Sequence, residues 1–219
     1  MFLRTKNRKA ISAVLTTLII LVASVVLGTG VVLYGTSLFQ TGAQSAGIST
    51  QGVHVWANST STPTYVWGAA EIRNSGDKIL SVDQINVRGT QIPFANWYFD
   101  SSAARVTSSN FQSQLVYTGL GTSGTANMMN TNNATSLASC PAGTKFAIQE
   151  IAPYSSSAPS MCFGQATGPI SLKPGDKTVV YFQVPNGVLS TVDAGAQSSV
   201  AVYAGNVGAP QTITVESKS

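Results

Sequence analysis

Side chains that commonly carry out catalysis or bind metals are scarce in this chain. It has one histidine, His54, two cysteines, and eight acidic residues that stand singly along the sequence. A copper site normally needs two histidines with a cysteine, and a Ser-His-Asp triad could form only around His54, which has no G-x-S-x-G or similar nucleophile motif. The carboxylates lack the D-x-D spacing of a calcium loop, although a carboxylate pair made by the fold stays open. We therefore predict no enzymatic activity, no metal and no cofactor.

The aromatic residues offer one further binding hypothesis. A short stretch contains four of them, Phe94, Trp97, Tyr98 and Phe99. Such a cluster can form a platform on which a sugar ring stacks, but aromatic residues more often pack in a core or between subunits. We favour packing as the interpretation.

The basic character of the chain comes from its N-terminus. The formal net charge is +4, and the excess lies in Arg4, Lys6, Arg8 and Lys9, because basic and acidic residues are equal in number beyond them. No later run of basic residues exists, so nucleic-acid binding is not expected. Residues 10–70 and 106–144 contain no charged side chain. A polar, uncharged surface of this kind is typical of proteins outside the cell.

An apolar run follows these basic residues directly. Ala13 to Tyr34 contains no charge, and as a helix it would reach about 33 Å, enough to cross a hydrocarbon core. That is too long for the apolar region of a cleaved secretory signal, and the apolar character continues to Phe39. Basic residues before the run and none after it place the N-terminus in the cytoplasm. The residues alone therefore predict a signal anchor with the large domain outside.

The start of this run carries a resemblance. Lys9-Ala10-Ile11-Ser12-Ala13-Val14, after a short basic leader, resembles the class III signal of archaeal type IV pilins and archaellins. In that superfamily the prepilin peptidase cuts on the cytoplasmic side of the helix, which implies cleavage between Lys9 and Ala10. Many archaeal pilins have proline at the position of Ala13, so this chain departs from their pattern there. Bacterial pilins have glutamate at the position of Val14, and its absence fits an archaeal rather than a bacterial member. A generic signal anchor is the alternative.

Small residues inside the apolar run suggest how helices could associate. Ser24 and Gly28 stand four residues apart and hence on one helix face, with Gly30 nearby. Lipid tails are as apolar as Leu or Val, so helices associate in lipid through the close packing that small residues permit. We predict an assembly face at Ser24, Gly28 and Gly30. Alternatively, the two glycines only loosen the helix so that it bends when a subunit leaves the bilayer.

The rest of the chain has the pattern of strands. After a linker from Gly35 to Thr50, short segments alternate apolar with polar residues, and turn signals such as NSGDK (74–78) and KPGDK (173–177) separate them. This pattern predicts a β-sandwich, and no comparable helical pattern follows residue 50. The apolar positions are Val53 and Val55, Ile85 and Val87, Phe146 and Ile148, Val180 with Phe182 and Val184, Val200 and Val202, and Ile213 and Val215.

The stretch LKPGDKTVVYFQV also resembles the penultimate strand region of the Ig-like domains in archaeal pilins and archaellins. The predicted fold class is therefore α+β, a long N-terminal hydrophobic helix followed by an all-β Ig-like sandwich. The predicted divisions are a removed leader at 1–9, a helix and linker at 10–50, and an extracellular domain at 51–219.

Two covalent features are expected in an outward-facing domain. Cys140 and Cys162 predict a disulfide contributing about 3 kcal/mol in the chain-entropy treatment, with two free buried thiols as the alternative. Residues 118–140 are low in complexity and predict a long exposed loop. Sequons at Asn58 and Asn133 allow N-glycosylation, although chance alone accounts for two.

These features together predict a structural protein, a pilin-like subunit whose helices pack into the core of an extracellular filament. Its partners would be further copies of itself, the membrane before assembly, and the prepilin peptidase with the pilus assembly machinery. The opening AISAVLTTL is more similar to archaeal pilins than to archaellins, which favours an adhesive pilus. The alternatives are an archaellin subunit of a swimming filament and a signal-anchored extracellular domain that binds a sugar or another ligand.

Overall fold

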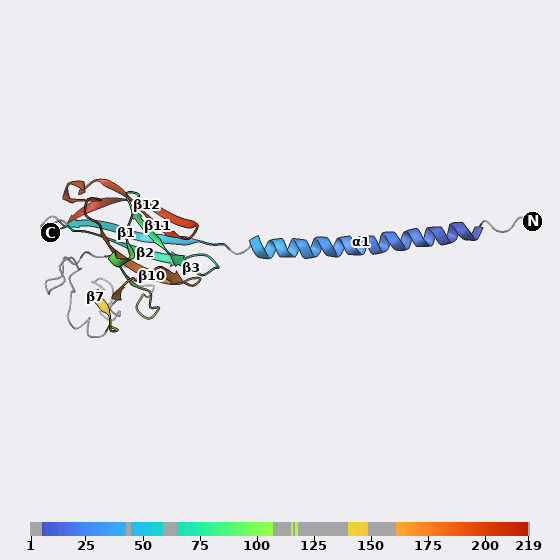
Figure 1. Cartoon of the computed structure of the whole chain (residues 1–219), viewed down its shortest axis with the longest axis horizontal. Coiled ribbons are helices and arrows are strands. Elements are labelled where there is room, and N and C mark those ends of the chain that lie inside the picture. Colours follow the sequence, from blue (N-terminus) through green and yellow to red (C-terminus); the bar gives the residue numbers. More distant parts are fainter. Residues whose placement is uncertain are drawn as a thin grey trace, which may run out of the picture. The chain divides into compact units, whose positions relative to one another are not determined.

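The computed structural model describes residues 6–42, 45–58, 65–106, 115, 117, 140–148 and 161–218. The chain divides into two compact units, Met1–Ser45 and Ala46–Ser219. The described part of the first is one helix, and that of the second is mostly strands (Figure 1). The predicted α+β class, a long N-terminal apolar helix followed by an all-β domain, is confirmed.

Helix α1 is longer than predicted, and the linker is correspondingly shorter. It spans Lys6–Gly42, so it continues through Gly35, where the sequence predicted a linker. A single glycine costs a helix only about 1 kcal/mol, and no proline follows before residue 50 to stop it. Strand β1 then begins at Ile48, inside the stretch predicted to be a linker.

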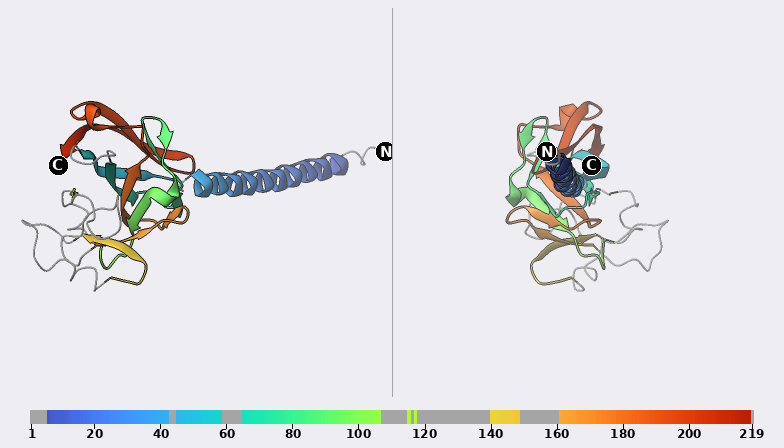
Figure 2. Two further views of the ribbon diagram at one scale, coloured as in Figure 1. Left: turned by 60° about the vertical axis from the view of Figure 1, so that its left-hand side comes forward. Right: turned by 90° about the vertical axis from the view of Figure 1, so that its right-hand side faces the viewer.

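The β unit contains one long sheet and one short one. In the described residues, the ten-stranded sheet has the order β5-β4-β11-β12-β1-β2-β10-β6-β8-β7, and β3 pairs with β9. Neighbours run antiparallel except β1 and β12, which are parallel. Figure 2 shows β11 and β12 (red) on one side of the unit and β7 (yellow) on the other. The strands are β1 Ile48–Asn58, β2 Val66–Asn74, β3 Leu80–Val82, β4 Gln84–Val87, β5 Thr90–Gln91, β6 Trp97–Asp100, β7 Thr144–Ile148, β8 Met161–Gln165, β9 Ile170–Leu172, β10 Lys177–Val184, β11 Gln197–Ala204 and β12 Val207–Lys218.

Two cores lie on opposite faces of the central strands. The first core collects side chains from β1, β2 and β10 together with β4, β11, β12 and the β3–β9 pair, so the two halves of the long sheet close on one interior as in a sandwich. The second, which we call the aromatic core, contains Trp56, Trp67, Phe146, Phe163 and Tyr181. Every pair or triplet of alternating apolar residues predicted from the sequence lies in a strand.

Strand β2 passes between the two cores and is buried on both faces. Trp67 belongs to the aromatic core and Ile72 to the first core. Gly68 is required by close packing, because a Cβ there would lie 2.3 Å from the Phe182 ring. The predicted period-two pattern is absent here because neither face is polar.

The aromatic stretch around β6 is core rather than a sugar platform. Trp97 is fully buried, and its indole N–H donates to the Ile92 carbonyl at 3.1 Å. Tyr98 is 8% exposed in the aromatic core, and Phe94 and Phe99 pack against the first core. The packing interpretation therefore holds for all four residues.

Candidate functional site

The apolar helix presents the largest hydrophobic surface in the described part of the chain. Its segment Ser12–Ser37 has a mean hydropathy of 2.4, none of it is buried, and it is long and apolar enough to cross a membrane. Large side chains such as Leu27 and Leu33 are each 70% exposed within the chain. A surface of this kind needs lipid or other protein to cover it.

Five hydroxyl groups of this helix donate hydrogen bonds to the helix backbone. Thr16 donates to the Ser12 carbonyl at 2.8 Å, and Ser24 donates to the Ile20 carbonyl at 2.7 Å. Thr17, Thr29 and Thr36 make the same kind of bond three or four residues back. Back-bonded hydroxyls need neither water nor a neighbouring chain, which suits a helix in an apolar medium.

The predicted assembly face is only partly supported by the helix geometry. Ser24 and Gly28 lie on one face of a continuous α-helix. The Ser24 hydroxyl bonds to its own helix backbone, so neither residue projects far from this face. Gly30 is two residues beyond Gly28 and therefore about 200° further around the axis, so it belongs to a different face. A Cβ at Gly28 or Gly30 would meet nothing within 4 Å. The fold of the single chain therefore does not require either glycine.

The predicted cleavage position lies inside α1. The helix begins at Lys6, so the backbone is helical at both Lys9 and Ala10, and the side chains there lie outside the described residues. The interpretation of this bond as a prepilin-peptidase site stays a prediction.

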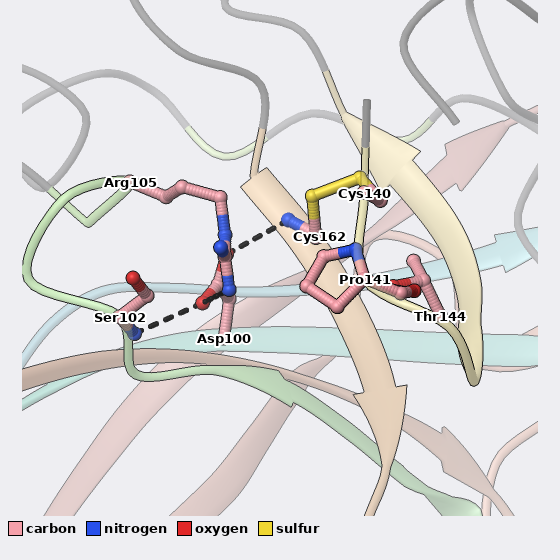
Figure 3. The surroundings of a disulfide bond; sticks show 7 residues. All are labelled: Asp100, Ser102, Arg105, Cys140, Pro141, Thr144 and Cys162. Atoms are coloured by element: carbon pink, nitrogen blue, oxygen red, sulfur yellow. Dashed lines mark hydrogen bonds and ion pairs between the residues drawn. A yellow bond between two sulfur atoms is a disulfide. The ribbon is translucent and has the colours of Figure 1, made fainter. Parts of the chain in front are cut away.

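The structure joins Cys140 and Cys162 by a disulfide, with their Cα atoms 5.7 Å apart. The backbone N–H of Cys162 donates to the carboxylate of Asp100 at 2.8 Å. Figure 3 shows the disulfide beside the ion pair of Asp100 with Arg105. The disulfide joins the segment before β7 to β8, and the hydrogen bond from Cys162 joins β8 to Asp100 at the end of β6.

Asp100 organises this region with one buried carboxylate. It is 2% exposed, and it accepts two bonds from the Arg105 guanidinium, at 2.7 and 3.1 Å. The Ser102 N–H donates to it at 3.0 Å, and the Thr178 hydroxyl donates to its backbone carbonyl. Charge-assisted bonds of this geometry are the strong class of protein hydrogen bonds. A cleft of about 360 Å³ lies beside the pair, lined by Arg105, Thr144 and Gln165 among others.

A second buried carboxyl, that of Glu71, lies in the same ten-stranded sheet as Asp100. Glu71 of β2 is 2% exposed, and its Oε1 atom has no hydrogen-bond partner. Burial raises the pKa of the Glu71 carboxyl to about 8, against a smaller lowering by the charge of Lys177. The carboxyl lies under Gly52, at a bulge of β1 where φ is +54°. Glu71 is therefore largely protonated at neutral pH.

The lone histidine belongs to a surface cluster at the end of β1 and β12. His54 Nδ1 lies 2.9 Å from a Glu216 oxygen, and the Trp56 indole N–H donates to the other oxygen at 3.2 Å. Lys218 pairs with the same carboxylate at 3.3 Å. Burial raises the pKa of the Glu216 carboxyl, but the hydrogen bonds from His54 and Lys218 outweigh it, so the pKa lies below its ordinary value. This arrangement holds the strand ends together and contains no nucleophile.

The two sequons differ in what can be said of them. Asn58 is 5% exposed, and its side-chain amide donates to the Tyr117 hydroxyl at 2.8 Å. A buried amide that is already hydrogen-bonded is a poor acceptor for a glycan on the folded domain. Asn133 lies outside the described residues, as does most of the predicted loop at 118–140.

Sequence reasoning missed Glu71, Asp100 and Arg105 as structural polar groups. The signal for Glu71 was present, since it interrupts the otherwise apolar run VWGAAEI of β2. Within the described residues, no three His, Cys, Asp or Glu side chains lie together as they would to hold a metal ion. The described residues thus present two features for a functional proposal, the exposed apolar helix α1 and the cross-linked β unit.

Comparison with known proteins assigns no class to this fold and site. No protein-family model matches the chain. No curated protein matches it either.

Proposed function

We propose that this chain is a structural subunit of an archaeal type IV pilus-like extracellular filament, assembled through its N-terminal helix and used for surface attachment. The precursor would lie in the cytoplasmic membrane with its N-terminus in the cytoplasm, and the prepilin peptidase would remove residues 1–9. An archaellin subunit of a swimming filament is a variant of this proposal, because it would also assemble through the N-terminal helix and carry the β unit outside.

The apolar helix carries the proposal. A helix whose large side chains are exposed, and whose hydroxyls bond to their own backbone, is suited both to a bilayer and to the dry centre of a bundle of like helices. The β unit supports the proposal in a second way. Its disulfide and its buried Asp100–Arg105 pair make a cross-linked domain suited to the outside of a cell.

Two measurements on sheared cell-surface material test the proposal. Intact-mass analysis should find a chain that begins at Ala10, and negative-stain microscopy should show long filaments that contain it. Replacing Lys9 with a neutral residue should leave precursor in the membrane. A chain that retains Met1 and forms no filaments would leave only a signal-anchored domain.

A signal-anchored extracellular binding domain is the second candidate. The cleft of about 360 Å³ beside Arg105 favours it, because it is the size of a small-ligand site and has polar walls. Glycan-array binding that is lost in Arg105→Ala would support this candidate, and filament formation by the same protein would argue against it.

A further inference from the structure

One end of the β unit is built around a buried asparagine. Asn74 is fully buried, and its side-chain amide donates to the carbonyls of Lys78 at 2.7 Å and Leu172 at 2.9 Å. Its side-chain oxygen accepts from the Gly76 N–H at 3.0 Å. Its backbone N–H donates to the Asp176 carbonyl. Asn74 therefore locks the two turns 75–79 and 173–176 together.

These turns flank the point where the chain enters the β unit. The N–H groups of Ser75 and Gly76 both donate to the carbonyl of Gly47, at 3.0 and 3.2 Å. Gly47 directly precedes β1. We call the two turns, with the adjoining ends of β2 and β10, the entry rim. Its shape is fixed by hydrogen bonds to one buried residue.

The side chains of the entry rim are basic and partly apolar. Lys78 and Lys173 are exposed in the two turns, which share the sequence Gly-Asp-Lys at 76–78 and 175–177. Ile79 is 66% exposed. The basic residues of the rim are Arg73, Lys78, Lys173 and Lys177, and its acidic residues are Asp77 and Asp176.

The four basic residues of the rim outnumber its two acidic ones. An oxygen of Asp176 accepts the backbone N–H of Lys173 at 3.0 Å, which closes the turn. Elsewhere in the described β unit, Arg88, Arg105 and Lys218 form ion pairs with Asp193, Asp100 and Glu216, and Lys145 stands exposed in β7. The entry rim therefore carries a net positive charge beside one exposed apolar side chain.

Covalent connection places a limit on how far this rim can be from the helix. Gly42 ends α1, and the five residues to Gly47 can span at most about 18 Å, whatever the orientation of the two units. Where the bilayer covers the helix to Ser37, Gly47 can therefore lie at most about 25 Å beyond the hydrocarbon core, so the entry rim is tethered within reach of the headgroups. Phosphate headgroups attract nearby lysines, and an exposed isoleucine can enter the interfacial layer.

We propose that the entry rim is a membrane-contact surface, on which Lys78 and Lys173 bind lipid phosphates and Ile79 enters the headgroup layer while the subunit waits in the membrane. This inference rests on the proposed membrane stage of the precursor. It adds that the β unit itself binds the bilayer surface, and it commits to lipid rather than to a neighbouring subunit as the partner.

The test compares two labelled positions in the full chain. Ile79→Cys carries an environment-sensitive fluorophore in the rim, and Val192→Cys, 88% exposed in the short helix Thr191–Asp193, is the matched control. The native cysteines are joined and so do not react. The protein is reconstituted into phosphatidylcholine vesicles containing phosphatidylglycerol and a headgroup spin-labelled lipid. We expect quenching at position 79 to exceed that at 192 by about threefold or more.

Two further comparisons identify the cause and the partner. Combined Lys78→Gln and Lys173→Gln should bring quenching at 79 toward the control, as should high salt. Equal quenching at both positions in protein that floats with the vesicles would overturn the inference but leave the proposed filament standing. Protein that does not float with the vesicles would overturn the membrane stage, and this inference with it. A label at 79 that is shielded only in filaments would instead assign the rim to a subunit contact and refute lipid binding.

Discussion

Replacing Glu71 by glutamine should remove a pH-dependent loss of stability. A carboxyl whose pKa is 4.5 when unfolded and about 8 when folded binds its proton more tightly in the folded state. Below pH 4.5 the carboxyl is protonated in both states and does not change the free energy of unfolding. As the pH rises from 4.5 to 8, the unfolded state loses this proton first, so the free energy of unfolding falls progressively. At about 1.4 kcal/mol per pH unit, the total penalty is about 5 kcal/mol above pH 8 and about 3 kcal/mol at pH 7.

Chemical denaturation of the full chain in detergent, followed by the fluorescence of the buried tryptophans, measures this penalty. Between pH 5 and pH 9 the free energy of unfolding of Glu71→Gln should rise by about 4 kcal/mol relative to that of the unsubstituted chain. The control is Glu216→Gln. The folded pKa of Glu216 lies below its ordinary value, so its stabilising contribution is present at neutral and high pH and is lost only as the pH falls through that pKa. A difference between Glu71→Gln and the unsubstituted chain that stays constant over this range would refute a buried, protonated Glu71.

Four further predictions test other parts of the structure. Cys140→Ser should lower the melting temperature by about 6–12 °C, measured by circular dichroism without reductant, and two freely alkylated thiols in the unsubstituted folded chain would contradict the bridge. Gly68→Ala should destabilise the chain by about 1–3 kcal/mol, because the added Cβ meets the Phe182 ring. Gly164→Ala is the control, because a Cβ there meets nothing within 4 Å, and equal effects of the two substitutions in denaturation would count against this packing. Asp100→Ala should cost about 3 kcal/mol, because the Ser102 and Cys162 N–H groups lose their acceptor together with Arg105. Arg105→Ala should cost less, because those two bonds to the carboxylate remain, and the reverse order in denaturation would show that Arg105 is the more important partner. Gly28→Leu should block filaments seen by negative stain while Gly28→Ala is nearly tolerated if Gly28 packs against a neighbour, whereas failure of Gly28→Ala would indicate that the glycine loosens the helix.

Among the strands that the sequence predicted, β4 and β11 alternate buried with less buried residues, whereas β10 was predicted although both of its faces are buried. The alternation seen at Ile85 and Val87 does not arise in β2, where Trp67 and Ile72 belong to different cores. Strands β6 and β8 are short, and their pairing depends on contacts far away in the sequence. Periodicity therefore identified β1 and β10 at the centre of the long sheet as well as β4, β11 and β12, but it missed β2, β6 and β8.

The distant hydrogen-bond partners of the polar groups inside the domain could not be predicted from the sequence. Asn74 holds the Leu172 carbonyl, and the Cys162 N–H donates to Asp100. A buried polar group is tolerated only when its partners are in place, and those partners are set by the tertiary fold. The disulfide was predictable because two cysteines in a domain expected to lie outside the cell leave one pairing.

The helix was the most predictable element, because an apolar medium decides its structure locally. In lipid, every backbone group must bond within the segment, and the hydroxyls of residues such as Thr29 do the same by bonding to the preceding turn. The hydroxyls of Thr16, Thr17, Ser24, Thr29 and Thr36 therefore need no new partner when the surroundings change from lipid to other helices. In the proposed filament, the shape of the helix surface would then decide how neighbouring helices pack, and the small residues Ser24 and Gly28 would matter more to assembly than the hydrogen bonds of these hydroxyls.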